Sequence, residues 1–183
     1  TTITANPPLL TNSSNASFSF TGNDSGGSGV ASFQCQLDGS GFSACTSPQS
    51  YSGLGDGSHT FQVRAIDNAG NTDLTPASYT WTVDTIAPAA PVVTTPANGS
   101  VTNNPTPLVS GTAEINSTVT VYIDGSAVGT ATADGTGNWN YPSASLGNGS
   151  HTVRARATGA VGNTSPDSNT NTFTVDATAP DTT

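Results

Sequence analysis

The chain repeats a long stretch of its own sequence. The segment LGDGSHTFQVRAIDNAGNTDLTPASYTWTVDTIAP starts at Leu54 and aligns without a gap, at an offset of 92 residues, with LGNGSHTVRARATGAVGNTSPDSNTNTFTVDATAP, which starts at Leu146. An offset of about half the 183-residue chain indicates two units of similar design, each just large enough to bury a core of its own. The sequence therefore predicts two domains, residues 1–86 and residues 87–183, the second of which ends in a linker.

Short segments of alternating polar and apolar residues recur between turn signals in both units. In HTFQVRAI, for example, Phe61, Val63 and Ala65 would face one side of a strand and the polar residues the other. About seven such segments in each unit predict an all-β fold of two tandem immunoglobulin-like β-sandwich domains. The linkers DTIAPAAP and DATAPDTT are short and contain proline, which favours an elongated arrangement of the two domains.

The charge of the chain excludes several kinds of partner. The net charge is −9, with three Arg and no Lys. Such a surface cannot neutralise phosphates, so we expect no binding to nucleic acid or to anionic lipid. No apolar run is long enough to span a bilayer, which predicts no membrane insertion in this segment. Divalent cations remain compatible with the acidic composition.

The ends of the chain suggest its wider context. The sequence has no Met, and its last residues, APDTT, would read smoothly into its first, TTIT. We therefore expect a segment of a longer protein in which the two-domain block recurs, with neighbouring copies of the same repeat as partners.

The two cysteines, Cys35 and Cys45, lie in the segment FQCQLDGSGFSAC, where Asp38-Gly39 predicts a tight turn between two strands. Opposed strands at this spacing can carry a disulfide, which would contribute about 2–3 kcal/mol for so short a loop. A redox or metal-binding pair is the alternative, although a metal would need further ligands. A disulfide implies an oxidising, extracellular location.

Two histidines occupy equivalent positions, His59 in the first unit and His151 in the second. Ser58 and Ser150 precede them, but neighbouring residues of a strand face opposite sides and cannot form a nucleophile–base pair. We interpret both histidines as hydrogen-bonded corner residues and expect no enzymatic activity.

Acidic residues gather in loops that should lie at the domain junctions. Asp24, Asp67 and Asp73 fall in loops at the end of the first sandwich where the chain comes in, and the linker of a preceding copy would add Asp176 and Asp181. Carboxylate oxygens are ligands that Ca²⁺ prefers. The alternative is that aspartates in turns bond to the backbone of their own loops.

A poorer calcium site would form at the internal junction. It would draw on Asp84, Glu114 and Asp56, while Gly159 and Ser165 replace the second-unit equivalents of Asp67 and Asp73. Neither interpretation requires a cofactor. The ion that these acids would accommodate is Ca²⁺.

Several of these motifs resemble one protein family. DGSHTFQVRAIDNAGN followed by WTVDTIAP, the run FQCQLDGSGFSACTSPQSYSGLGDGSHTF, and SGTAEINSTVTVYIDG are similar to bacterial Ig-like repeats of large cell-surface and adhesin proteins. Ile115-Asn116 stands where Pro-Gly is usual in that family. The resemblance covers nearly the whole chain and implies stalks and spacers that hold an adhesive tip away from a cell.

We therefore expect a structural repeat of a long extracellular bacterial surface protein, acting as a spacer or stalk in an adhesin or fibre. One alternative is a self-assembling filament subunit that is joined through edge strands or linkers. Another is a glycan- or protein-binding module, for which Trp139 and Tyr141 in GNWNYP would supply an exposed aromatic surface.

Overall fold

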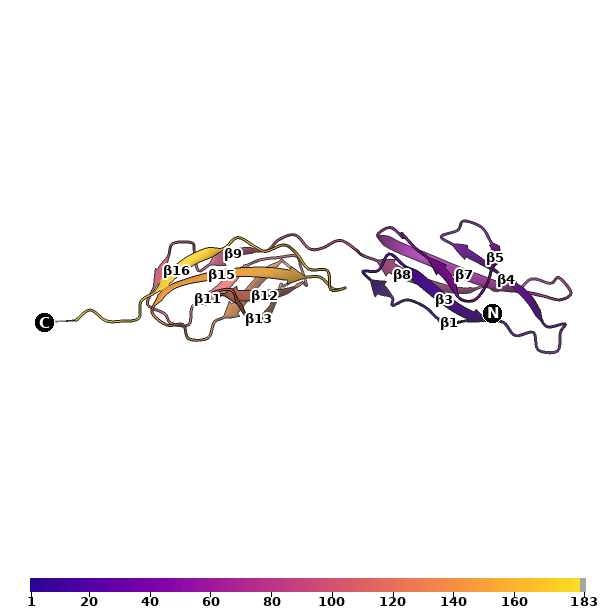
Figure 1. The fold of residues 1–183 in the computed structure, drawn as a ribbon, viewed down its shortest axis with the longest axis horizontal. Helices are drawn as coiled ribbons and strands as arrows, with labels where there is room; N and C mark the ends of the chain where they lie inside the picture. Colours follow the sequence, from indigo (N-terminus) through magenta and orange to yellow (C-terminus); the bar gives the residue numbers. More distant parts are fainter. Residues whose placement is uncertain (182–183) are drawn as a thin grey trace. The chain divides into compact units, whose positions relative to one another are not determined.

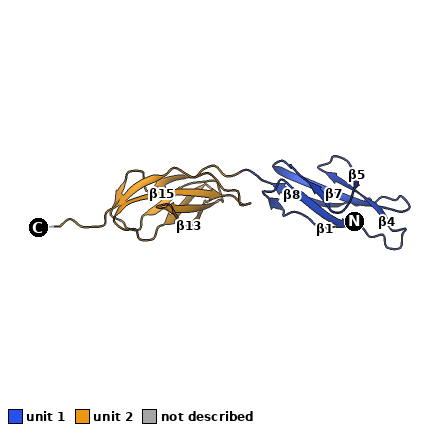
Figure 2. Ribbon diagram, in the orientation of Figure 1, with its two compact units in different colours: residues 1–86 blue, residues 87–183 orange. Residues whose placement is uncertain are grey.

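The computed structural model describes residues 1–181, which form strands, turns and bends without a helix (Figure 1). The chain separates into two compact units, Thr1–Ile86 and Ala87–Thr183 (Figure 2). Each unit contains two sheets and a hydrophobic cluster of its own, which confirms the prediction of two tandem β-sandwiches. The described residues include no helix of a length and apolarity that would cross a bilayer.

Unit 1 combines a five-stranded sheet with a three-stranded one. The five-stranded sheet has the order β2 (Leu10–Thr11), β8 (Ala77–Val83), β7 (Gly57–Asp67), β4 (Val30–Leu37) and β5 (Ser43–Cys45). The three-stranded sheet has the order β1 (Thr2–Ala5), β3 (Ala16–Thr21) and β6 (Gln49–Tyr51).

Unit 2 has the same plan. Its five-stranded sheet has the order β10 (Val101–Thr102), β16 (Asn171–Val175), β15 (Gly149–Thr158), β12 (Thr118–Ile123) and β13 (Ser126–Thr132). Its three-stranded sheet has the order β14 (Asn138–Pro142), β11 (Leu108–Thr112) and β9 (Val92–Thr95). The two sheet orders correspond strand for strand, as expected for two copies of one design.

The sequence did not predict the two shortest strands, β2 and β10. Each pairs in parallel with the last strand of its unit, β2 with β8 and β10 with β16. A strand of two residues shows no alternation, so its pairing partner alone defines it.

Unit 1 has an aromatic core. Phe18 of β3 stacks on Phe61 of β7 at a centroid distance of 4.1 Å, and Trp81 of β8 lies 5.1 Å from Phe18. All three side chains are buried. Because Phe18 belongs to the three-stranded sheet and the other two to the five-stranded sheet, these rings join the two layers.

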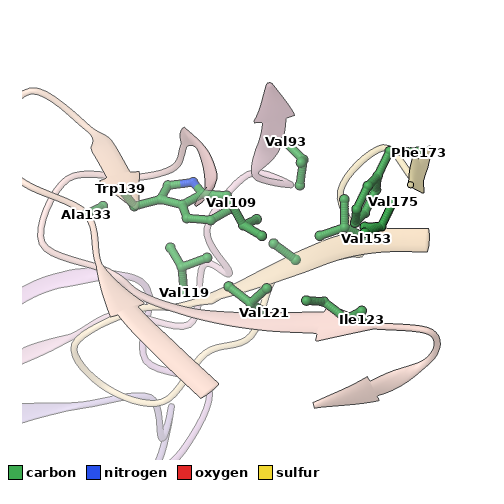
Figure 3. Close-up of a cluster of buried hydrophobic side chains, with 11 residues drawn as sticks. Val93, Val109, Val119, Val121, Ile123, Ala133, Trp139, Val153, Phe173 and Val175 are labelled. Atoms are coloured by element: carbon green, nitrogen blue, oxygen red, sulfur yellow. The ribbon is translucent and has the colours of Figure 1, made fainter. Parts of the chain in front are cut away.

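Unit 2 has a core of smaller aliphatic side chains around one tryptophan. Alternate residues of β12, among them Val119 and Val121, are fully buried. They face Val109 of β11 and Trp139 of β14 across the sandwich (Figure 3). The alternation that the sequence showed in this strand therefore places its apolar side in the core.

Candidate functional site

Three predicted calcium ligands line one pocket in unit 1. Asp24 comes from the loop between β3 and β4, and Asp67 and Asp73 flank the turn that follows β7. The pocket has a volume of about 210 Å³. Asn23, Asn71 and Thr72 add further polar groups to its wall, and Val30 and Ala65 form its apolar part.

Each of these carboxylates accepts hydrogen bonds from nearby residues. The Oδ2 of Asp24 accepts from the Gly29 amide at 2.9 Å. The Oδ1 of Asp67 accepts from the Asn71 amide at 2.8 Å. The Oδ2 of Asp73 accepts from the Thr1 hydroxyl at 2.8 Å. These bonds hold the three carboxylates at one end of the sandwich. They also occupy some of the hydrogen-bonding positions of the carboxylate oxygens.

The hydrogen bonds also keep two of the carboxyls ionised. Donation from Asn71, first its side chain and then its backbone, lowers the pKa of Asp67. The pKa of Asp73 lies far below its ordinary value, chiefly because the Thr75 amide and the Thr1 hydroxyl donate to it. This pattern matches the Asx-turn alternative. Within residues 1–181, no group of three or more His, Cys, Asp or Glu side chains is arranged to hold a metal ion.

The remaining predicted ligands also bond locally. Asp84 accepts from the Ile86 amide at 3.1 Å, Asp176 accepts from the Thr178 amide at 3.2 Å, and the Glu114 backbone carbonyl accepts from Ser117. Asp181 is the last described residue. The convergence of Asp176 and Asp181 on a neighbouring copy, and that of Asp84 and Glu114 at the internal junction, stay predictions.

The disulfide joins Cys35 of β4 to Cys45 of β5, with a Cα–Cα distance of 5.8 Å. The residues directly opposite one another are Phe33 with Cys45 and Cys35 with Ser43, so the bridge runs diagonally across the hairpin. It fixes the three-residue edge strand β5 to β4.

Both histidines form corner clamps. The Nδ1 of His59 lies 2.8 Å from Asp38 Oδ2, and its Nε2 lies 2.8 Å from the Gly55 carbonyl oxygen. His151 repeats the arrangement with Asp124 and the Gly147 carbonyl. Both ring nitrogens of each histidine therefore contact acceptors within the fold, which agrees with the interpretation of these residues as hydrogen-bonded corner residues.

The residue before Gly57 in unit 1 and the residue before Gly149 in unit 2 each accept a hydrogen bond from the segment that follows the last strand. The Oδ1 of Asp56 accepts from the Thr85 amide at 2.6 Å. At the equivalent place, the Oδ1 of Asn148 accepts from the Ala177 amide at 2.9 Å. The sequence repeat marks these positions, but only the pairing of β7 with β8 and of β15 with β16 shows what they contact.

The prediction of an exposed aromatic surface at Trp139 and Tyr141 is wrong. Trp139 is 2% exposed and packs in the core of unit 2. The half-buried Tyr141 donates its hydroxyl to the Val128 carbonyl at 2.7 Å. Both residues lie on the core side of β14 because they are two positions apart, and Asn138 and Asn140 take the exposed side.

Backbone hydrogen bonds that the sequence did not predict join the last strand of each unit to its short early strand. The Thr82 amide donates to the Leu9 carbonyl and the Asp84 amide to the Thr11 carbonyl, which ties β8 to the β2 segment. In unit 2, the Thr174 amide donates to Ser100 and the Asp176 amide to Thr102. The recurrence of LTN at Leu10 and VTN at Val101 is the sequence signal that would have found these strands.

Comparisons with known proteins agree with this architecture. Residues 94–177 match the family model described as bacterial Ig-like domain. No curated protein matches the sequence. The fibronectin(III)-like modules of Clostridium thermocellum CbhA are 17% identical with a TM-score of 0.54, over 95% of this chain and 93% of theirs, which shows a shared fold.

Two adhesin structures are similar at lower TM-scores. A tetra-tandem repeat in the extending region of a large adhesion protein is 25% identical with a TM-score of 0.43, over 92% of this chain and 46% of that chain. A Ca²⁺-stabilized adhesin that helps an Antarctic bacterium bind ice is 25% identical with a TM-score of 0.42, again over 92% and 46%. The chain thus spans less than half the length of either adhesin chain.

Proposed function

We propose, on the premise that residues 94–177 form a bacterial Ig-like domain, that this chain is a spacer repeat of an extracellular bacterial surface protein. The observation that supports this function best is the parallel pairing of an early strand with the last strand in each unit, β2 with β8 and β10 with β16. The disulfide fits an oxidising, extracellular location.

The parallel pairs of strands resist a pull along the chain. When the two ends of a unit are drawn apart, β10 and β16 would have to slide past one another, so that their hydrogen bonds must break together. In unit 2 these bonds include those from the Gly99, Thr174 and Asp176 amides. A spacer that holds a distant tip needs this resistance, and it needs no ligand.

The corner bonds add stiffness at the point where the chain leaves each unit. Asp56 holds Thr85, and Asn148 holds Ala177, directly after the last strand. A tension that reaches these residues is therefore passed to the folded unit rather than to a loose segment.

Single-molecule force spectroscopy on the full chain tests the spacer function. Thr174→Pro removes the donor to Ser100 without removing a bond to β15, because the amides of a strand alternate between its two neighbours. We expect a lower unfolding force for unit 2, while Thr174→Val, which keeps the amide, retains the native force.

Unit 1 is the internal reference in this experiment. Its disulfide encloses a separation of 10 residues. The disulfide therefore shortens the length of chain that is released when unit 1 unfolds by about 35 Å. This shorter length identifies the unfolding events of unit 1. Equal unfolding forces for Thr174→Pro and the native chain would contradict the proposal.

Calcium binding at the end of unit 1 is a separate proposal. It is supported by three acids that line one pocket, Asp24, Asp67 and Asp73, and it includes Asp176 and Asp181 of a preceding copy. In a protein with two consecutive blocks, we expect millimolar Ca²⁺, but not Mg²⁺, to raise the Tm. Asp24→Asn should abolish the rise and Asp134→Asn, in a loop of unit 2, should not. An unchanged Tm in the native tandem would refute it.

A further inference from the structure

The outer face of the five-stranded sheet of unit 1 carries four planar polar side chains in one block. Gln34 of β4 lies directly opposite Arg64 of β7, and Gln36 lies opposite Gln62. The residues that alternate with them along both strands are in the core, so all four side chains point away from it. We call these four residues, each of them half-buried, the Gln–Arg block.

The guanidinium of Arg64 is held in place with one of its edges open. Its Nε and Nη2 donate to Gln34 Oε1 at 3.0 and 2.8 Å. Its central carbon lies 4.0 Å from the centroid of the Phe42 ring, a cation–π contact. The bonds to Gln34 use the side edge, so Nη1 and the second hydrogen of Nη2 form an end edge with two parallel donors. No described residue accepts a hydrogen bond from this end edge.

The charge of Arg64 is not neutralised by an acid. Arg154 and Arg156, in unit 2, both form ion pairs with Asp167. Within residues 1–181, no carboxylate lies within ion-pair distance of Arg64. In a chain with a net charge of −9, the Gln–Arg block is therefore a local cationic site that complements a single carboxylate.

Gln36 and Gln62 supply neutral hydrogen-bonding groups beside this cation. Residues two positions apart on a strand share a face, so Gln62 adjoins Arg64 on β7. In the part of the chain that the structure describes, neither of these two carboxamides bonds to another residue. A carboxamide both donates and accepts, and so does a sugar hydroxyl.

We propose that the Gln–Arg block binds a hexuronic acid residue of an acidic polysaccharide, a role separate from that of a spacer. The sugar carboxylate accepts two parallel hydrogen bonds from the end edge of Arg64. The ring hydroxyls exchange hydrogen bonds with the carboxamides of Gln36 and Gln62.

Other ligand classes fit this face less well. β4 and β7 each pair with a strand on both sides, so neither offers free backbone groups to an extended peptide. A polyphosphate would meet one unpaired cation on a molecule that carries −9.

Nuclear magnetic resonance titration of the full chain with methyl glucuronide tests the proposal. Saturable shifts should appear in β4, β5 and β7. Methyl glucoside has the same ring without the carboxylate, and it should bind about tenfold more weakly because it leaves the end edge of Arg64 unpaired. Equal affinity for the two sugars, or no saturable shift with the glucuronide, would overturn the proposal.

Substitutions in the Gln–Arg block locate the binding. Arg64→Gln should raise the dissociation constant for methyl glucuronide about tenfold. Arg64→Lys keeps the charge without the two parallel donors and should also weaken binding. Gln62→Ala should weaken binding through the lost carboxamide, whereas Arg154→Gln, in unit 2, should bind like the native chain. Native affinity in Arg64→Gln would place the site elsewhere and refute the proposal.

Two controls separate this result from misfolding and from peptide binding. Arg64→Gln should keep the peak dispersion of the native spectrum. If it does not, Arg64→Lys and Gln62→Ala decide, and native affinity in both would refute the site. N-acetylglutamate amide, a carboxylate on a peptide frame, should bind more weakly than the glucuronide. Equal affinity for this compound would assign the block to acidic peptides and overturn the polysaccharide as its ligand.

Discussion

His59 and Asp38 form an ion pair, with 2.8 Å between Nδ1 and Oδ2, that ties the turn after β4 to the corner before β7. The other ring nitrogen faces the Gly55 carbonyl. A carboxylate and a carbonyl both accept only, so both ring nitrogens can donate when the histidine is protonated. His151 and Asp124 form the same pair in unit 2 at 2.7 Å.

We predict that the free energy of unfolding decreases as the pH rises through the pKa of the two folded histidines. Hydrogen bonds to Gly55 and then to Asp38 raise the pKa of His59, and bonds to Asp124 and then to Gly147 raise that of His151. An unfolded histidine has a pKa of about 6.5. The stabilisation is therefore fully present below that pH and is lost as the pH rises through the folded pKa. Urea unfolding from mildly acidic to mildly alkaline pH measures this loss.

Substitution of both histidines provides the control for this pH dependence. His59→Gln with His151→Gln should remove this slope, since histidine is the side chain whose ordinary pKa lies closest to neutrality. A slope that survives both substitutions would show that another group is responsible.

We predict a large loss of stability for Gly111→Ala in β11. A Cβ there would lie 1.8 Å from the Val92 carbonyl oxygen, a backbone atom of the adjacent strand β9 that cannot move without breaking the pairing. We expect a loss of at least about 2 kcal/mol by chemical denaturation. Gly135→Ala, where a Cβ would meet nothing within 4 Å, is the matched control and should be neutral. Equal stability of the two variants would refute the close approach.

Removal of the disulfide should weaken unit 1 alone. Cys35→Ala with Cys45→Ala opens a loop with a separation of 10 residues. The expected loss is about 2–3 kcal/mol from the entropy of the unfolded chain. Differential scanning calorimetry should show a lower transition temperature for unit 1, whereas a shift of both transitions would contradict the independence of the two cores.

Trp139→Ala should act on stability and not on ligand binding. The side chain is 2% exposed in the core of unit 2. We expect a loss of about 3–5 kcal/mol, as for other buried aromatics. Thermal unfolding measures the loss of stability. A glycan array probed with the native chain tests for ligand binding. Signal on the array that depends on Trp139 in folded protein would contradict its place in the core.

The predicted calcium ligands show how far loop positions can be read from the sequence. Asp24, Asp67 and Asp73 were expected at one end of the first sandwich, and they line one pocket there. What their oxygens contact could not be predicted, because each bond depends on the exact course of a loop. The burial of Trp139 could not be predicted either, because the segment GNWNYP does not indicate which face of β14 packs against the core.

The period-two alternation and the repeat at an offset of 92 were enough to predict two β-sandwich units, because both signals are local or visible in the residues themselves. The pairing of β2 with β8 and the clamp of His59 on Asp38 depend on which strands become neighbours across long sequence separations. Those neighbours are chosen by packing around the core, so only the tertiary structure reveals them.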